Sequence, residues 1–232
     1  MKLLYRGKAK SVYEVDADTV VMEFRDDITA GDGAKKKSIQ GKGSLNAEIS
    51  TKFFELLKEK GIRTHFIKFE EPNRHLVKKV KIMPLEVICR NIATGSLVRR
   101  YPFKEGQELR PPVIEMGYKS DEYHDPMLND EIALALGAAK DKKELDEIRK
   151  ITLKVNDILK KFLAAKGIIL VDFKLEFGRD SKGSLLLADE ISPDTCRFWD
   201  AKTKEIMDKD RFRKDMGSVL EFYEEVRRRV VG

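Results

Sequence analysis

Cysteine and histidine are scarce in this chain of 232 residues, which contains two cysteines and three histidines. Cys89 and Cys196 make neither a disulfide framework nor a metal motif, so a reducing compartment, the cytoplasm, is the expected location. His65 and His75 have no partner at a metal-ligand spacing, and we predict that both are structural or surface residues.

Long hydrophobic runs are missing too. The chain reaches charge at Lys2 and again at Arg6, which is too early for the apolar core of a signal peptide. No apolar run approaches the roughly 20 residues that cross a membrane. We therefore expect a protein that is neither exported nor embedded in a membrane.

Two common catalytic signatures are also absent. No glycine-lysine-serine/threonine sequence opens a helix, so the Walker phosphate-binding pattern is not present. No nucleophile stands in a convincing pattern with a general base. The sequence therefore does not point to nucleophilic catalysis by the protein.

Charge, in contrast, is abundant. Charged residues make up 37% of the chain and hydrophobic residues 41%, which is typical of a soluble globular protein with a sizeable core. The length allows one large domain or two lobes with a cleft between them. The net charge of +6 favours anionic partners, namely phosphometabolites, nucleotides or nucleic acid.

The strongest local pattern lies at residues 171–178, where apolar and charged residues alternate strictly as in a strand with two unlike faces. A glycine-flanked turn at 178–183 predicts that an apolar run at 185–188 returns antiparallel and ends at Asp189 and Glu190. The apolar positions of the first strand are Val171, Phe173, Leu175 and Phe177, and its charged positions are Asp172, Lys174 and Glu176.

The carboxylates of this hairpin are suitable ligands for Mg²⁺, which takes one or two carboxylates plus phosphates and waters. Lys174, between Asp172 and Glu176, would offset their repulsion or meet an anionic substrate. The alternative is a half-solvated surface strand without a ligand.

The remaining periodicity predicts a mixed α and β chain. A long acidic and glycine-rich loop is expected at residues 26–43, with Ser44 as the N-cap of the helix that follows, and a second loop at 101–112. Residues 81–84 are expected to connect two lobes, because Pro84 cannot donate to a strand ladder. Strands are predicted at residues 3–5, 11–15, 19–24, 62–69, 75–82 and 85–91, and helices at 44–61, 141–166 and 210–229.

Two further segments carry groups that bind phosphate. The turn at residues 6–10 combines a glycine with three cations, although such a turn is more often solvated surface. A predicted strand delivers Arg90 next to the hydroxyls of Thr94 and Ser96, and these donors suit a phosphate monoester.

Several longer motifs occur in one order along nearly the whole chain. They are Arg6-Gly7-Lys8-Ala9-Lys10, Ala30-Gly31-Asp32-Gly33, Pro84-Leu85-Glu86-Val87 with Arg90 and Thr94-Gly95-Ser96, His124-Asp125-Pro126, residues 171–178, Asp189-Glu190-Ile191-Ser192-Pro193-Asp194, and Asp208-Lys209-Asp210-Arg211-Phe212-Arg213. This set resembles the SAICAR synthetases, the phosphoribosylaminoimidazole-succinocarboxamide synthases of purine biosynthesis.

The resemblance implies a two-lobed α+β fold of ATP-grasp type, with antiparallel sheets and a nucleotide cleft between an N-terminal lobe, 1–83, and a C-terminal lobe, 84–232. It implies ATP-driven joining of L-aspartate to the carboxylate of carboxyaminoimidazole ribonucleotide (CAIR), through an acyl phosphate. ATP and Mg²⁺ are the implied cofactors, and a homodimer is the implied assembly, with neither nucleic acid nor membrane as a partner.

The resemblance also implies roles for individual residues. For the nucleotide these are Gly7, Lys8, Ala9 and Lys10 over the phosphates, Lys81, Ile82 and Met83 as the adenine-binding strand, and Lys119 as a further contact. Glu176 and Asp189 resemble the Mg²⁺ ligands, and Arg90, Ser96 and Arg197 resemble the binders of the CAIR phosphate. Lys174, Asp172 and Asp32 are implied at the reacting groups, and Asp125 and Arg213 in the substrate site.

Two other classes remain open at this point. A nucleic-acid-binding protein would explain the basic charge, but the cations lack interleaved aromatics or a recognisable module. A different ATP-dependent carboxylate ligase would share the nucleotide site and differ in the acceptor pocket. The aspartate pocket and the group that accepts the proton of the amine stay unassigned.

Overall fold

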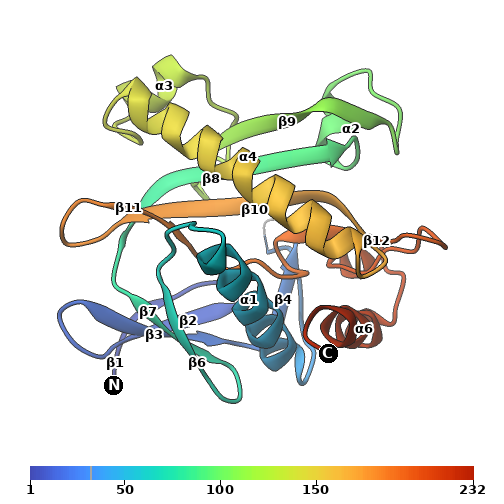
Figure 1. The fold of residues 1–232 in the computed structure, drawn as a ribbon, viewed down its shortest axis with the longest axis horizontal. Coiled ribbons are helices and arrows are strands. Elements are labelled where there is room, and N and C mark those ends of the chain that lie inside the picture. The colour runs from blue at the N-terminus through green and yellow to red at the C-terminus, as the bar shows by residue number, and fades with distance from the viewer. Residues whose placement is uncertain (32) are drawn as a thin grey trace.

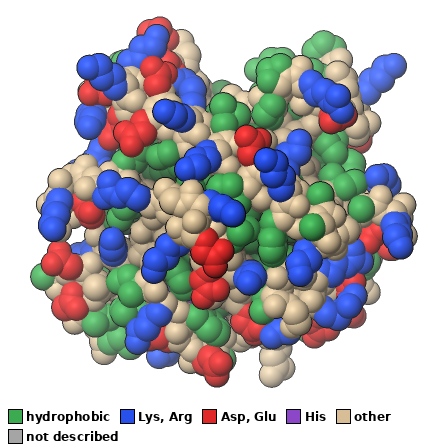
Figure 2. Space-filling view, viewed as in Figure 1, with side chains coloured by type: hydrophobic (Ala, Val, Ile, Leu, Met, Phe, Trp, Pro, Cys, Tyr) green, Lys and Arg blue, Asp and Glu red, His purple; other side chains and the backbone are tan. Residues whose placement is uncertain are grey.

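The computed structural model describes residues 1–31 and 33–232, and it is an α+β structure built on antiparallel sheets. Figure 1 shows two sheets one above the other, the lower crossed by helix α1 and the upper by helix α4. Figure 2 shows Lys and Arg side chains interspersed with Asp and Glu over the same face. None of the helices in the described residues is long and apolar enough to cross a membrane.

The first sheet has five strands in the order β1-β2-β3-β7-β6. Each neighbouring pair is antiparallel, and β3 is the buried centre of the sheet. Helix α1 packs against β3, β6 and β7. The bounds are β1 Lys2–Arg6, β2 Lys10–Glu14, β3 Thr19–Phe24, β6 Phe66–Glu70, β7 Arg74–Lys78 and α1 Lys42–Glu59.

Helix α1 begins two residues earlier than the sequence pattern indicates, so the prediction of Ser44 as its N-cap is wrong. Gly41 holds the cap position with a φ of 90°, a conformation that suits glycine. The backbone N–H of Gly43 donates to Asp26 Oδ1 at 2.9 Å. The Asp26 carboxylate therefore accepts the hydrogen bond that the side chain of an N-cap residue would normally accept.

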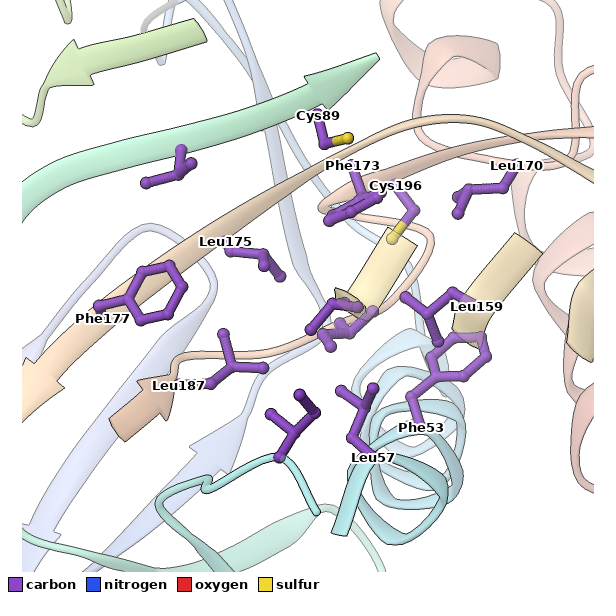
Figure 3. Packing of buried hydrophobic residues seen from close by; sticks show 14 of the residues in the cluster. Phe53, Leu57, Cys89, Leu159, Leu170, Phe173, Leu175, Phe177, Leu187 and Cys196 are labelled. Carbon is purple, nitrogen blue, oxygen red and sulfur yellow. The ribbon is translucent and has the colours of Figure 1, made fainter. Parts of the chain in front are cut away.

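The second sheet has the order β11-β10-β8-β9. β12 also pairs with β10, along residues 168–173, whereas β11 pairs with residues 176–179. Helix α4 covers this sheet, and residues of β10, β11, α1 and α4 meet in one hydrophobic core (Figure 3). The bounds are β8 Lys81–Ile92, β9 Glu108–Tyr118, β10 Ile168–Arg179, β11 Leu185–Ala188, β12 Cys196–Asp200 and α4 Lys142–Ala164.

The predicted hairpin of β10 and β11 is confirmed, with Glu176 opposite Ala188 and Phe177 opposite Leu187. Phe173, Leu175 and Phe177 point into the core, as Figure 3 shows. The alternative of a half-solvated surface strand is wrong, because Asp172 and Glu176 on the other face are each only 3% exposed.

Three predicted boundaries are wrong, and the first two involve proline. Residues 81–84 are the start of β8, not a connection, and Pro84 lies where the pairing with β10 shifts register. The loop expected at 101–112 contains the first part of β9, whose prolines lie at another register shift. At such shifts a ladder hydrogen bond is not required, so proline is tolerated.

The third wrong boundary is the last helix, which is two helices, α5 Asp210–Arg213 and α6 Val219–Val230. Gly217 and Ser218 between them both have positive φ and interrupt the helix. The loop predicted at 26–43 likewise holds a two-stranded sheet of β4, Asp27–Ala30, and β5, Lys35–Ser38. Two short helices complete the fold, α2 Ser96–Arg100 and α3 Asp130–Ala135.

Candidate active site

A cavity of about 1020 Å³ is lined by residues of both five-stranded sheets and of the loops between them. Residues predicted for the site from distant parts of the sequence line this one cavity. They are Gly7, Lys8, Ala9, Lys10, Ile82, Met83, Arg90, Ser96, Lys119, Asp125, Asp172, Lys174, Glu176, Asp189, Arg197 and Arg213. Lys81 is exposed and is not among the lining residues, and Asp32 lies outside the described residues.

The charged face of β10 forms one wall of this cavity. Lys174 Nζ donates to Glu86 Oε1 at 2.7 Å and to Glu176 Oε1 at 3.0 Å, while Lys119 pairs with the other oxygen of Glu176. Burial would lower the pKa of Lys174, but the charges of Glu176, Glu86 and Asp189 hold it well above its ordinary value. Lys174 is therefore a fixed, permanently protonated cation.

The loop after β11 faces this wall and carries a second cluster of opposite charges. Lys10, from the first sheet, pairs with Asp189 and with Glu190 Oε1 at 2.8 Å. Burial would raise the pKa of Asp189, but Lys10, Lys174 and Lys119 lower it. Asp189 therefore stays ionised among three lysines, and Lys10 ties the first sheet to the second.

The turn at residues 6–10 is shaped by Arg25, which the sequence analysis did not identify. Arg25 donates to the carbonyl oxygens of Gly7 and Lys10, both at 2.7 Å. Lys8 reaches from the turn to Asp121 across 2.7 Å. Arg25 thereby fixes the turn, and residues 7–10 line the cavity.

Arg90 lies near the end of β8 as a fully buried cation, and three side chains bind its guanidinium. It pairs through Nε with Glu115, donates Nη1 to Asp172 at 3.0 Å, and donates Nη2 to Ser96 Oγ at 2.8 Å. Glu115, on β9, was missed because the first part of its strand was predicted as a loop that ends at residue 112 and the rest of the strand was not predicted. A fixed fork of this kind suits a planar or tetrahedral oxyanion.

Arg197 lies beside Arg90 and shares Asp172 with it. It donates Nη1 to Asp172 and Nε to Asp210, each at 2.8 Å. Asp210 also accepts from Arg213 Nη1 at 2.5 Å. A Cβ added at Gly95 would lie 2.8 Å from Arg197 Nη2, so glycine is needed there for the backbone to approach the guanidinium.

The comparisons with known proteins agree with one another over nearly the whole chain. The SAICAR synthetase family model matches residues 3–230. A phosphoribosylaminoimidazole-succinocarboxamide synthase from Methanocaldococcus jannaschii is 60% identical over 227 residues, which are 98% of this chain and 93% of the relative. The chain belongs to the SAICAR synthetase family.

Other relatives agree with this assignment. A synthase from Pyrococcus horikoshii is 56% identical over 229 residues, 99% of this chain and 95% of the relative. The solved structure of a SAICAR synthetase (Type-2) in complex with ADP has a TM-score of 0.96 and 55% identity, and covers 99% of this chain and 97% of that one. The activity is therefore that of the family: ATP-dependent ligation of L-aspartate to CAIR in purine biosynthesis.

Glu176 and Asp189 of this SAICAR synthetase fit Mg²⁺ in their chemistry. Among the described residues no group of three or more His, Cys, Asp or Glu could hold a metal ion. Mg²⁺ does not need such a group, because it keeps waters and substrate phosphates and uses one or two carboxylates. Glu176 and Asp189 supply hard carboxylate oxygens, and both have Lys174 and Lys119 as charged neighbours.

A buried cluster supports the floor of the site in this family member. Asp194 accepts from Lys42 Nζ at 2.7 Å, Asn46 Nδ2 at 2.9 Å and Tyr223 Oη at 2.8 Å. Burial would raise the pKa of Asp194, but Lys42 and Lys209 lower it. The cluster joins α1 and α6 to the loop after β11, and only its Asp194 lay within a motif identified from sequence.

Proposed function

We propose that the cavity binds ATP between two lobes of an ATP-grasp-like fold, with the chain dividing near residue 83. The support is the topology: the last strand of the first sheet ends at Lys78 and the second sheet begins at Lys81, so the sheets change two to five residues before this division, and residues of both sheets line the cavity. The turn at residues 6–10 covers the ATP phosphates, and Ile82 and Met83 line the adenine end together with backbone groups of Lys81. We place the nucleotide between the two sheets because charged side chains from both sheets line the cavity there.

The CAIR phosphate is assigned to Arg90, Ser96 and Arg197. The observation that carries this assignment is the pair of guanidinium groups locked by Asp172, with a serine hydroxyl and the loop at Gly95 beside them. Two fixed guanidinium groups give a phosphate monoester strong, directional hydrogen bonds. Asp125 and Arg213 complete the substrate site, and Asp32 is proposed near the reacting groups from the family resemblance.

The reaction we propose has two steps. A carboxylate oxygen of CAIR attacks the γ-phosphorus of ATP, so an O–P bond forms, the bond to ADP breaks, and an acyl phosphate results. The amine of L-aspartate then attacks the acyl carbon, phosphate leaves with the C–O electron pair, and the nitrogen gives up its proton. A carboxylate is a poor acyl donor, and the first step provides the leaving group that it lacks.

The protein contributes position and electrostatics to both steps. Lys174, fixed by Glu86 and Glu176, offsets charge at the reacting carboxylate, while Lys10 and Lys119 face the polyphosphate. Bound Mg²⁺, held by Glu176 and Asp189, would neutralise charge on the phosphate oxygens. Asp172 acts by orienting Arg90 and Arg197.

Phosphate release from ATP tests this function, measured with CAIR alone, L-aspartate alone and both together, with Mg²⁺ present. We expect release that depends on both substrates and a succinocarboxamide product. CAIR-independent release, or release with a different amine, would instead favour another carboxylate ligase. Cytoplasmic location and a homodimer also stay predictions, and sedimentation analysis of the purified chain tests the second.

A further inference from the structure

His65 is a cavity-lining residue to which the assignments above give no role. It is only 3% exposed, yet it lies among the residues that line the cavity of the candidate site. Its backbone joins the two sheets, because its N–H donates to Leu187 O, on β11, at 2.9 Å and its carbonyl oxygen accepts from Lys78 N, on β7, at 2.7 Å. The imidazole is therefore presented to the cavity from a fixed support.

The imidazole donates a hydrogen bond to the loop after β11. Its Nε2 lies 3.1 Å from the carbonyl oxygen of Asp189. A carbonyl oxygen can only accept, so Nε2 carries the proton and donates it. β11 ends at Ala188, so the Asp189 carbonyl group lies beyond the strand ladder, and His65 supplies its donor.

The backbone turns sharply at Asp189. Its φ of 59° lies in the left-handed region, which residues other than glycine seldom adopt. Adjacent side chains of a strand point to opposite faces, yet Asp189 and Glu190 both pair with the ammonium of Lys10. The turn at Asp189 therefore brings two consecutive carboxylates to one cation at the cavity wall.

We propose that His65 is a positioning residue, whose N–H holds the Asp189 carbonyl and with it the turn that aims the Asp189 carboxylate at Mg²⁺ and the ATP phosphates. The inference rests on the proposed function, in which Glu176 and Asp189 hold Mg²⁺. A hydrogen bond from behind a ligating residue fixes the orientation of the ligand and increases the affinity for the metal. The role belongs to the N–H, whereas the ring itself packs edge-on against Phe54, with 5.5 Å between the ring centroids.

His65→Phe tests the proposal, because it removes the N–H and keeps an aromatic ring beside Phe54. The measurement is the dissociation constant of ADP by calorimetry, once with Mg²⁺ and once with EDTA. The ratio of the EDTA value to the Mg²⁺ value is the gain in affinity that the metal provides. We expect this gain to fall by about tenfold or more in the variant. A gain equal to that of the unmodified enzyme would overturn the proposal.

His75→Phe is the matched control. His75, on β7, is also buried, and its Nε2 lies 2.9 Å from Ala47 O, but it is not among the described residues that line the cavity. It should keep the gain of the unmodified enzyme. An equal fall in both variants would mean a general effect of losing a buried histidine and would also overturn the proposal. His65→Gln, whose side-chain amide can donate in place of Nε2, should recover part of the gain.

A crystal structure of His65→Phe separates the positioning from the metal role. We expect Asp189 to leave its left-handed conformation and its carboxylate to move away from Lys10, and an unchanged Asp189 would overturn the proposal. If the unmodified enzyme binds ADP equally with and without Mg²⁺, the metal role of Asp189 is wrong, while the crystal structure still decides whether His65 holds the turn. Thermal unfolding verifies the fold of the variant. If His65→Phe is unfolded, His65→Met, which also lacks an N–H and packs more adaptably, replaces it in both experiments.

Discussion

The Lys42 ammonium lies 2.7 Å from the Asp194 carboxylate, and the two side chains are only 1% and 5% exposed. The pair joins the first turn of α1 to the loop after β11. Removing one partner of such a pair leaves an uncompensated buried charge. Lys42→Met should therefore lower the free energy of unfolding by about 3 to 5 kcal/mol, measured by urea denaturation.

The exposed lysine of the last turn of the same helix provides the control. Lys58→Met should change the free energy of unfolding by no more than about 0.5 kcal/mol. If Lys42→Met were equally harmless, the Asp194 cluster would contribute nothing to the floor of the site.

Replacing Glu176 should remove activity without removing the fold. Glu176→Gln deletes one proposed Mg²⁺ ligand and the charge that helps fix Lys174, but no core area. We expect the turnover number to fall by about 100-fold or more. The thermal unfolding midpoint should stay close to that of the unmodified enzyme. Glu147→Gln, an exposed change on α4, should leave both quantities unaltered; full activity of Glu176→Gln would refute the metal role.

Gly95 offers a test of the proposed phosphate site. Gly95→Ala places a Cβ 2.8 Å from Arg197 Nη2 and should displace the guanidinium, raising the KM for CAIR by about tenfold or more. Gly106→Ala, in the loop between α2 and β9, also has positive φ but meets nothing within 4 Å. Both changes add backbone strain, and Gly95→Ala adds more, because φ 61° with ψ −123° lies outside the left-handed helical region that alanine can enter. Only the first should alter the KM for CAIR, and similar KM values for both would refute the assignment.

His75 should make the stability of the fold depend on pH. Burial lowers its pKa to about 3, with smaller contributions from the charges of His65 and Lys10. The unfolded chain, whose histidine titrates near pH 6.5, therefore binds a proton first as the pH falls. The resulting stability is complete above pH 6.5 and is lost progressively towards pH 3.

His75→Phe removes this titration and keeps an aromatic ring among Phe24, Phe66 and Phe69. Between about pH 7.5 and 4.5, the unmodified chain should lose about 3 kcal/mol more free energy of unfolding than the variant. Chemical denaturation at both pH values measures the difference. Equal losses would show that His75 is solvated when protonated.

The sequence predicted those parts of the site in which chemistry and periodicity coincide. On β10, Asp172, Lys174 and Glu176 are recognisable because they alternate with core residues. Glu115 was not recognisable, since the prolines of β9 disguise its strand and only the register with β8 brings it to Arg90. Asp210 lay within a recognised motif, but its hold on Arg197 depends on a contact between β12 and α5.

The errors in the fold have a common physical cause. Ser44 has the properties of a helix cap, yet the Asp26 carboxylate supplies the bond that a cap would provide. Tertiary contacts of this kind override local propensity, and a single sequence gives no sign of them. The end of α5 at Arg213 is not an error of this kind. Gly217 is a helix-breaking residue in the sequence, and it could have predicted the interruption before α6.

The alternation along β10 has a consequence for how this enzyme can fail. A slip of one residue in the pairing with β8 would exchange the two faces, moving Phe173 and Leu175 into the cavity and Lys174 into the core. A chain with β10 out of register would lose both the core packing of β10 and the charged side chains that it places in the cavity. Turnover is therefore itself an assay of correct folding, and the fraction of active molecules in a preparation reports the fraction in register.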